Sequence, residues 1–332
     1  MSGEGQVIMR VRTLAPGCLL LLTAAAPAEA PIGRFQTWLA FKKAPMAFAS
    51  GGVTVRVAAL PCPAQPVGDS TCRWEGYNNR ALITVSAPGV VPSSVTTDRQ
   101  SAYVRIAVVR FRRDDPRRGV IVESQYGGSG GTMTVQLLVP NGDGYRAVSM
   151  DRRGGFDLQG ELADSPHDLS GDGRIDLKLE DGAFDSVFGC NACTPRPPKL
   201  FTIEDGEIVD ESRDPALRGV FAADMRRLAP ICLSKARDRN GACAAYVADA
   251  ARAGRFDAAW TAMLKHYDHD GARGEPCNVP ASAWPDHRCP EGHVTRFASF
   301  PASLYAFLRR TGYLPARCRQ RMPFEHALPI RR

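Results

Sequence analysis

Short runs of alternating apolar and polar residues recur between about residue 50 and residue 210. The clearest runs lie at 53–60, 81–86, 103–111, 120–124 and 132–139. Successive side chains of a strand point to opposite faces, so a period of two is typical of half-buried β-strands. The pattern predicts a β-rich domain over residues 48–210, with a propeller-like or a sandwich architecture.

Two dipeptides between such runs indicate hairpin turns. Asn141-Gly142 and Asp205-Gly206 each place glycine where a tight turn requires a positive φ. The charged segment 112–119 is expected to be an exposed connection. No repeat of 20–50 residues is evident, so the pattern predicts no countable set of propeller blades.

The periodicity changes after Asp210. Apolar residues then recur at helical spacing, with Pro215 suited to a first helical turn; these residues are Leu217, Phe221, Met225, Leu228 and Cys232. Residues 242–253 and 256–267 predict a helical hairpin broken at Gly254, and 301–310 predict a last helix ending at Gly312. We therefore expect an α+β chain, in which a small helical region at 215–315 follows the β-rich domain.

The N-terminal residues 1–30 have the pattern of a secretory signal peptide. Arg10 and Arg12 precede an apolar run at 14–26, and the small residues Ala28 and Ala30 suit cleavage. The apolar run is too short to span a bilayer, so no membrane span is expected. The signal predicts a periplasmic or secreted protein.

The cysteines agree with an oxidising compartment. One of the ten, Cys18, lies within the expected signal. Close spacing predicts three local disulfides: Cys62 with Cys72, Cys232 with Cys243, and Cys277 with Cys289. Cys190 and Cys193 form a CxxC motif that could be a redox dithiol. The prolines that follow it favour a structural disulfide, or pairing with other cysteines.

Positive charge gathers at the C-terminus. The chain carries a formal net charge of +7, and residues 316–332 form a basic tail. The arginines are not interleaved with nucleic-acid-binding motifs, and the protein is expected to be exported. We therefore expect no nucleic-acid partner. Anionic cell-wall polymers or lipid headgroups suit such a tail better, although a solvated tail has the same composition.

The segment Asp168 to Asp176, DLSGDGRID, has the spacing of a calcium loop. Oxygen-bearing side chains occupy positions 1, 3, 5 and 9, and Gly173 follows at position 6, where a sharp turn is needed; these ligands are Asp168, Ser170, Asp172 and Asp176. Arg174 could add its backbone carbonyl. Position 12 is Leu179 instead of the glutamate of a helix-loop-helix site, and the alternation after the loop predicts a strand. The alternative is a solvated turn that binds no metal.

The run HDLSGDGRIDLKL resembles the DxNGDGxxDL loop of FG-GAP and VCBS-type repeats, which occur in calcium-binding β-propeller proteins. More loosely, ESQYGGSGGTMTVQLLV and FTIEDGEIVD resemble exported bacterial proteins that share a propeller-like fold with periplasmic inhibitors of lysozyme and peptidoglycan hydrolases. The resemblance covers residues 104–210 and implies calcium as cofactor and a cell-envelope protein, such as a peptidoglycan hydrolase, as partner. One departure stands out, because Met133 occupies the place of the tyrosine in the inhibitors' SGxxY loop.

Catalytic motifs are present only in part. Gly127 to Gly131 matches GxSxG around Ser129, but a nucleophile elbow requires a following helix and a strand is expected here. His266 and His269 lack a third zinc ligand at recognisable spacing. A calcium-stabilised binding protein is therefore expected. The alternatives are an exported hydrolase with structural calcium and a cell-envelope protein that binds anionic polymer.

Loops on a rigid scaffold commonly carry recognition. We expect the binding surface to include Tyr126, Ser129 and Phe184, in the loops 126–131 and 181–188. Aromatic side chains at these positions could anchor a partner. The alternative is that they belong to the core.

Overall fold

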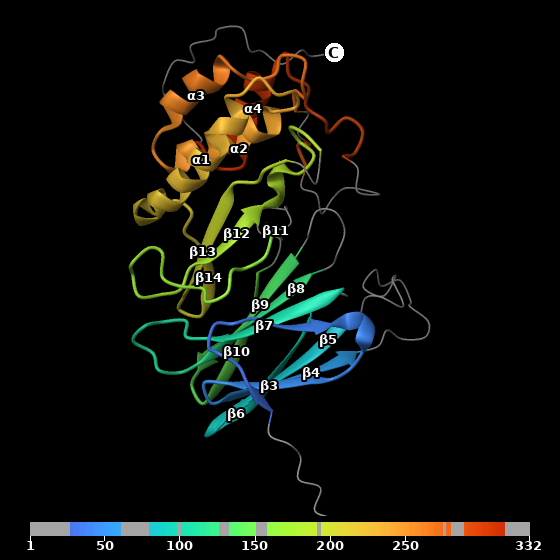
Figure 1. Ribbon diagram of the computed structural model, residues 1–332, viewed down its shortest axis with the longest axis vertical. Coiled ribbons are helices and arrows are strands. Elements are labelled where there is room, and N and C mark those ends of the chain that lie inside the picture. Colours follow the sequence, from blue (N-terminus) through green and yellow to red (C-terminus); the bar gives the residue numbers. More distant parts are fainter. Residues whose placement is uncertain are drawn as a thin grey trace, which may run out of the picture.

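The chain folds into two β-sheets followed by a group of helices at one end of the molecule (Figure 1). This computed structural model describes residues 27–60, 80–97, 101–125, 133–150, 158–190, 194–274, 277–279 and 289–315. A β-rich N-terminal part and a helical C-terminal part make an α+β chain, as the sequence predicts.

The first sheet contains five strands in the order β1-β3-β4-β5-β6. They are β1 (Ala28–Glu29), β3 (Met46–Ser50), β4 (Val53–Leu60), β5 (Arg80–Ala87) and β6 (Val90–Thr96). β3 to β6 pair antiparallel with their neighbours, whereas β1 pairs with β3 in parallel.

The second sheet contains nine strands, with β10 paired to β9 beside the path β14-β13-β12-β11-β9-β8-β7-β2. Its strands pair antiparallel throughout the described residues. Its strands are β2 (Gln36–Leu39), β7 (Tyr103–Val109), β8 (Gly119–Gln125), β9 (Met133–Asn141), β10 (Gly144–Met150), β11 (Leu158–Gln159), β12 (Leu177–Asp181), β13 (Pro198–Glu204) and β14 (Glu207–Asp210).

The two sheets share one hydrophobic core. Val55 and Ile83 of the first sheet belong to the same buried cluster as Ile106 and Val122 of the second, so this part is a β-sandwich. The opposite face of the second sheet builds another cluster, which includes Leu137 and extends over β12 to β14. β8 is buried along its whole length because both of its faces are covered.

Four α-helices pack around their own core. They are α1 (Arg218–Cys232), α2 (Asn240–Arg252), α3 (Phe256–Leu264) and α4 (Phe300–Arg310). α2 is rich in alanine and is buried from Asn240 to Ala250, which allows its neighbours to approach closely. Among the described residues, no helix combines the length and the apolar character needed to cross a bilayer.

Apolar contacts join the sheet to the helices in the described part of the chain. Leu200 of β13 packs against Leu217 and Phe221 at the start of the helical part. The short 3₁₀-helix η4 (Gly182–Phe184), directly after β12, carries Phe184 into the helical core, where its ring meets Phe307 and Tyr313 edge to face.

Most expected elements are confirmed, with shifted boundaries. The hairpins at Asn141-Gly142 and Asp205-Gly206 form, and Gly254 and Gly312 adopt positive φ where helices were expected to end. The sheets begin at β1, earlier than the expected boundary at residue 48. Ala28–Glu29 falls within the expected signal at 1–30, whereas residues 1–26 and the basic tail lie outside the described residues.

Candidate calcium loop

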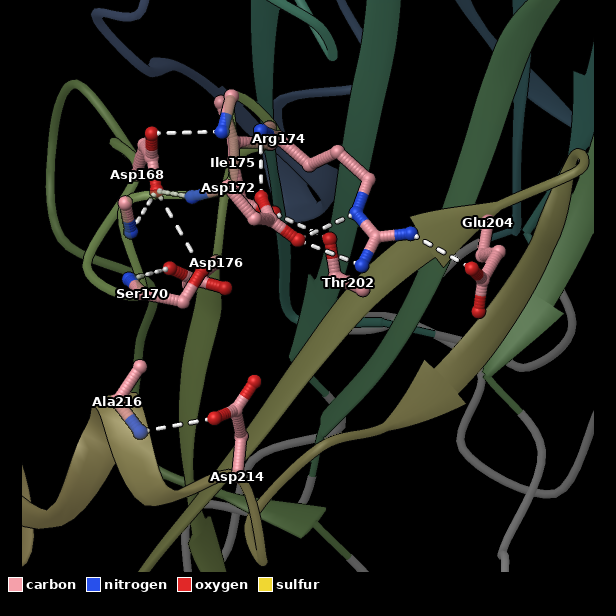
Figure 2. Close-up of polar contacts among 12 residues, drawn as sticks. Asp168, Ser170, Asp172, Arg174, Ile175, Asp176, Thr202, Glu204, Asp214 and Ala216 are labelled. Atoms are coloured by element: carbon pink, nitrogen blue, oxygen red, sulfur yellow. Dashed lines mark hydrogen bonds and ion pairs between the residues drawn. The ribbon is translucent and has the colours of Figure 1, made fainter.

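Asp168 organises the loop between β11 and β12. One of its carboxylate oxygens accepts the backbone N–H groups of Gly171 and Asp172, and the other accepts that of Gly173 at 2.9 Å (Figure 2). Gly171 and Gly173 have φ of 87° and 90°, which gives the chain its turn around this carboxylate. Partial burial raises the pKa of Asp168, but the amide hydrogen bonds outweigh it and hold the pKa below its usual range.

Asp172 is turned toward an arginine. Its carboxylate accepts the backbone N–H of Arg174 at 2.8 Å and the guanidinium Nε–H at 2.7 Å. The same guanidinium reaches Glu204 on β13 at 3.0 Å (Figure 2). Asp168 forms a longer pair with Arg113, whose side chain is 77 % exposed, and such pairs are weak. Arginines therefore hold two of the predicted ligands.

Asp176 points back into the loop. One carboxylate oxygen accepts the backbone N–H groups of Leu169 and Ser170. The other oxygen, Oδ1, is buried and receives no hydrogen bond from the described residues. A buried oxygen of a charged group without a partner is costly, so this atom marks a place where a cation or a proton is needed.

Glu211 is a further acid at this site, which the sequence analysis did not identify. It follows β14, and its Oε1 is likewise buried without a hydrogen-bond donor among the described residues. Burial, followed by the nearby carboxylate of Asp176, raises the pKa of Glu211 to about 9. Local spacing could not reveal Glu211, because it lies far from the loop in sequence.

The donor set fits a hard cation such as calcium. The set comprises four carboxylates, the Ser170 hydroxyl and the Arg174 backbone carbonyl, and calcium prefers such oxygen ligands. Within the described part of the chain, no three His, Cys, Asp or Glu side chains already converge as a metal site. Calcium would therefore compete with Arg174 and Arg113 for Asp172 and Asp168. The loop residues Asp168, Ser170, Asp172 and Asp176 remain the predicted ligands, together with the Arg174 carbonyl.

The predicted binding surface needs one correction. Phe184 is 0 % exposed and belongs to the helical core, because η4 turns it inward toward α4. Phe188 is buried in the same way. Tyr126 and Ser129 lie outside the described residues. β8 and β9, which flank them, pair antiparallel, and β9 is the strand that was expected to follow Ser129.

Two of the predicted disulfides are present in the helical part. Cys232 bonds to Cys243 and Cys277 bonds to Cys289. Cys190 is also disulfide-bonded, whereas Cys62 and Cys72 lie outside the described residues. These bonds indicate an oxidising, extracytoplasmic compartment.

A hollow of about 220 Å³ lies near the loop, lined by three arginines among other residues. Arg112, Arg117 and Arg146 contribute guanidinium groups, and each pairs with an acid: Asp114, Asp115 and Glu207 respectively. Arg112 also forms an isolated antiparallel bridge to Arg174 of the loop. The hollow is thus connected to the candidate site through the backbone.

The helical part of the chain resembles a known protein family. A family model described as the sll0997 C-terminal domain matches residues 221–312, which contain most of α1 and all of α2 to α4. The chain is 27 % identical over 225 residues to "Probable thylakoid lumen protein sll0997" of Synechocystis sp., covering 64 % of this chain and 61 % of that protein.

A second relative is "Uncharacterized protein y4bJ" of Sinorhizobium fredii. The chain is 27 % identical to it over 296 residues, covering 86 % of this chain and 43 % of that protein. The chain thus spans less than two thirds of the length of either curated relative. No solved structure matches the chain significantly.

Proposed function

We propose that this chain is an exported binding protein whose 168–176 loop is fixed by calcium. The observation that carries the proposal is the arrangement of the loop acids. Asp168 gathers three backbone amides around itself, while Asp176 directs a buried, unpartnered oxygen toward a second acid. A calcium ion would supply the positive charge that this arrangement lacks.

Two observations support export. The disulfides of the helical part suit an oxidising compartment, and the cyanobacterial relative is named as a probable lumen protein. Together with the expected signal peptide, they favour a periplasmic or secreted location for this chain.

The proposed partner is a protein of the cell envelope, and a peptidoglycan hydrolase follows from the resemblance of residues 104–210. A sandwich with both faces of β8 covered is a rigid scaffold, on which loops can carry recognition. Because Phe184 is buried, the contact is expected from the loop that contains Tyr126 and Ser129. The purified chain should inhibit lysozyme if this target class is correct. Undiminished lysozyme activity in the presence of excess protein would exclude lysozyme-like hydrolases as the target class.

Calcium binding is tested by calorimetry and thermal melting. With a dissociation constant of about 10⁻⁴ M, 5 mM calcium should stabilise the native chain by about 2 kcal/mol. The double variant D168A/D172A should show neither binding heat nor a shift in melting temperature. D114A removes an exposed acid that pairs with Arg112 and should respond like the native chain. Native protein that shows no calcium heat and no shift would refute the proposal.

A second candidate function is binding of anionic polymer, favoured by the three arginines of the hollow. Guanidinium groups suit phosphate and carboxylate ligands, although Asp114, Asp115 and Glu207 already pair with them. Polyphosphate should then bind in a salt-dependent manner, and R117A/R146A should weaken it. Equal binding by this variant would exclude the hollow as the site.

A further inference from the structure

We infer that Glu211 is a calcium ligand supplied from outside the loop, which joins the calcium site to the start of the helical part. The inference rests on the proposed calcium binding and goes beyond it, because the 168–176 loop does not contain this residue. It assigns a role to the connection between β14 and the 3₁₀-helix η5 (Pro215–Leu217).

The backbone fixes Glu211 beside the loop. Its N–H donates to the carbonyl of Leu200 at 3.0 Å, and its own carbonyl accepts the N–H of Asp214 at 2.8 Å. Leu169 of the loop packs against the buried Leu200 and Leu217, which lie on the segments to either side of Glu211. The carboxylate of Asp176 is close enough to raise the pKa of Glu211. Its position therefore depends on the sheet pairing and on the turn into η5.

Each of the two acids has one buried oxygen without a hydrogen-bond partner among the described residues. Asp176 is 3 % exposed, and its Oδ1 receives no hydrogen bond from the described residues; the same is true of Glu211 Oε1. The other oxygen of Asp176 is held by the amides of Leu169 and Ser170, so its carboxylate cannot simply turn away. Two neighbouring carboxylates that each have a buried oxygen repel each other unless a proton or a cation lies between them.

Glu211 also supplies what the loop lacks. A helix-loop-helix site completes its coordination with a glutamate at position 12. Here position 12 is Leu179, which is buried on β12 in the core of the sheet. A final carboxylate would then come from another segment, and Glu211 is the acid outside the loop whose pKa the carboxylate of Asp176 raises and whose own oxygen is buried without a partner among the described residues.

Ligation by Glu211 would couple calcium to the helices. Three residues later, Asp214 caps η5 by accepting the N–H of Ala216 at 2.8 Å (Figure 2), and η5 leads directly into α1. An ion held by both Asp176 and Glu211 would fix the start of this segment. We expect calcium to slow proteolysis at the β14–η5 connection as well as in the loop.

The test is calorimetric titration of the full chain with calcium chloride. E211Q should bind calcium at least about tenfold more weakly than the native chain, because a charged ligand is lost. The fold should persist without calcium, since the Gln amide can donate to Asp176 Oδ1. The control E207Q removes an exposed acid from β14 and should bind like the native chain.

The possible outcomes separate this inference from the proposed function. Native-like affinity in E211Q, with binding lost in D168A/D172A, would overturn the role of Glu211 alone. Absence of calcium binding in the native chain would overturn both. If E211Q fails to fold, E211D withdraws the carboxylate by one methylene and should still weaken binding; unchanged affinity in E211D would overturn the inference.

Discussion

At the scale of single residues, Asp249 is a buried acid to which no described residue donates a hydrogen bond. It lies on α2 and is 0 % exposed, and neither of its carboxylate oxygens receives a hydrogen bond from the described residues. Burial, followed by the neighbouring carboxylate of Asp224, raises the pKa of Asp249 well above its usual value. A protonated Asp249 can donate to Asp224, which also pairs with Arg227.

The raised pKa predicts how stability depends on pH. Between the usual aspartate pKa and the raised one, the folded chain binds more protons than the unfolded chain, so this residue's contribution to stability falls as pH rises. D249N removes the ionisation and keeps a donor for Asp224. We expect the free energy of unfolding of D249N to exceed that of the native chain by about 1–2 kcal/mol at pH 8, and by less at pH 5.

Urea unfolding at both pH values checks this prediction. D143N, at an exposed position in the β9–β10 hairpin, serves as the control and should leave the pH dependence unchanged. A D249N variant whose stability relative to the native chain is the same at pH 5 and pH 8 would show that Asp249 does not titrate in this range.

At the scale of elements, the Cys232–Cys243 disulfide joins the end of α1 to the first turn of α2. Both cysteines are fully buried in the helical core. A bond that closes so short a loop is expected to contribute about 2–3 kcal/mol, chiefly by constraining the unfolded chain.

Reduction should therefore destabilise the helices more than the sandwich. Far-UV circular dichroism should show the helical signal melting earlier in the C232A/C243A variant, while the strand signal changes less. C277A/C289A, which removes the second disulfide, gives the comparison within the same region. If the helical and the strand signals melt at the same lowered temperature, the two parts unfold as one cooperative unit.

The local hydrophobic pattern predicted those strands and helices well that bury one face and expose the other. β4 alternates buried and exposed residues as its sequence does, and α1 buries Phe221 and Leu228 at helical spacing. β1 and β2 escaped notice because each depends on pairing with a partner distant in sequence, β3 and β7 respectively. Two-residue and four-residue strands carry too little periodicity to be recognised alone.

The site was predicted only where its residues are neighbours in sequence. The loop from Asp168 to Asp176 and its turn at Gly173 follow from spacing, because one short segment contains them. Phe184 was misassigned, since nothing local distinguishes an aromatic residue in an exposed loop from one that η4 turns into another core. Glu211 was missed because only the pairing of β13 with β12 and β14 brings it to the loop.

At the scale of the whole molecule, a buried hydrogen bond links sheet and helices. The Tyr313 hydroxyl, just after α4, donates to Asp181 at the end of β12 over 2.9 Å. Asp181 is 1 % exposed; its other oxygen accepts the N–H of Ala183, and Lys199 lies 3.7 Å away. Burial, followed by the charge of Asp181, raises the pKa of Tyr313. The hydroxyl consequently stays protonated and donating at neutral pH.

Removing this hydroxyl should loosen the junction without disrupting either core. Y313F preserves the ring that packs edge to face on Phe184, but leaves an Asp181 oxygen without its hydroxyl donor. We expect the free energy of unfolding of Y313F to fall by about 1–3 kcal/mol, which is the cost of an unsatisfied buried acceptor.

Y305F is the control. It removes a hydroxyl from a half-buried position on α4 and should change stability by less than about 0.5 kcal/mol. Urea unfolding followed by circular dichroism and tryptophan fluorescence measures both variants. Equal stability of Y313F and Y305F would show that apolar packing holds the helices on the sheet, through Phe184 and through the cluster of Leu200, Leu217 and Phe221.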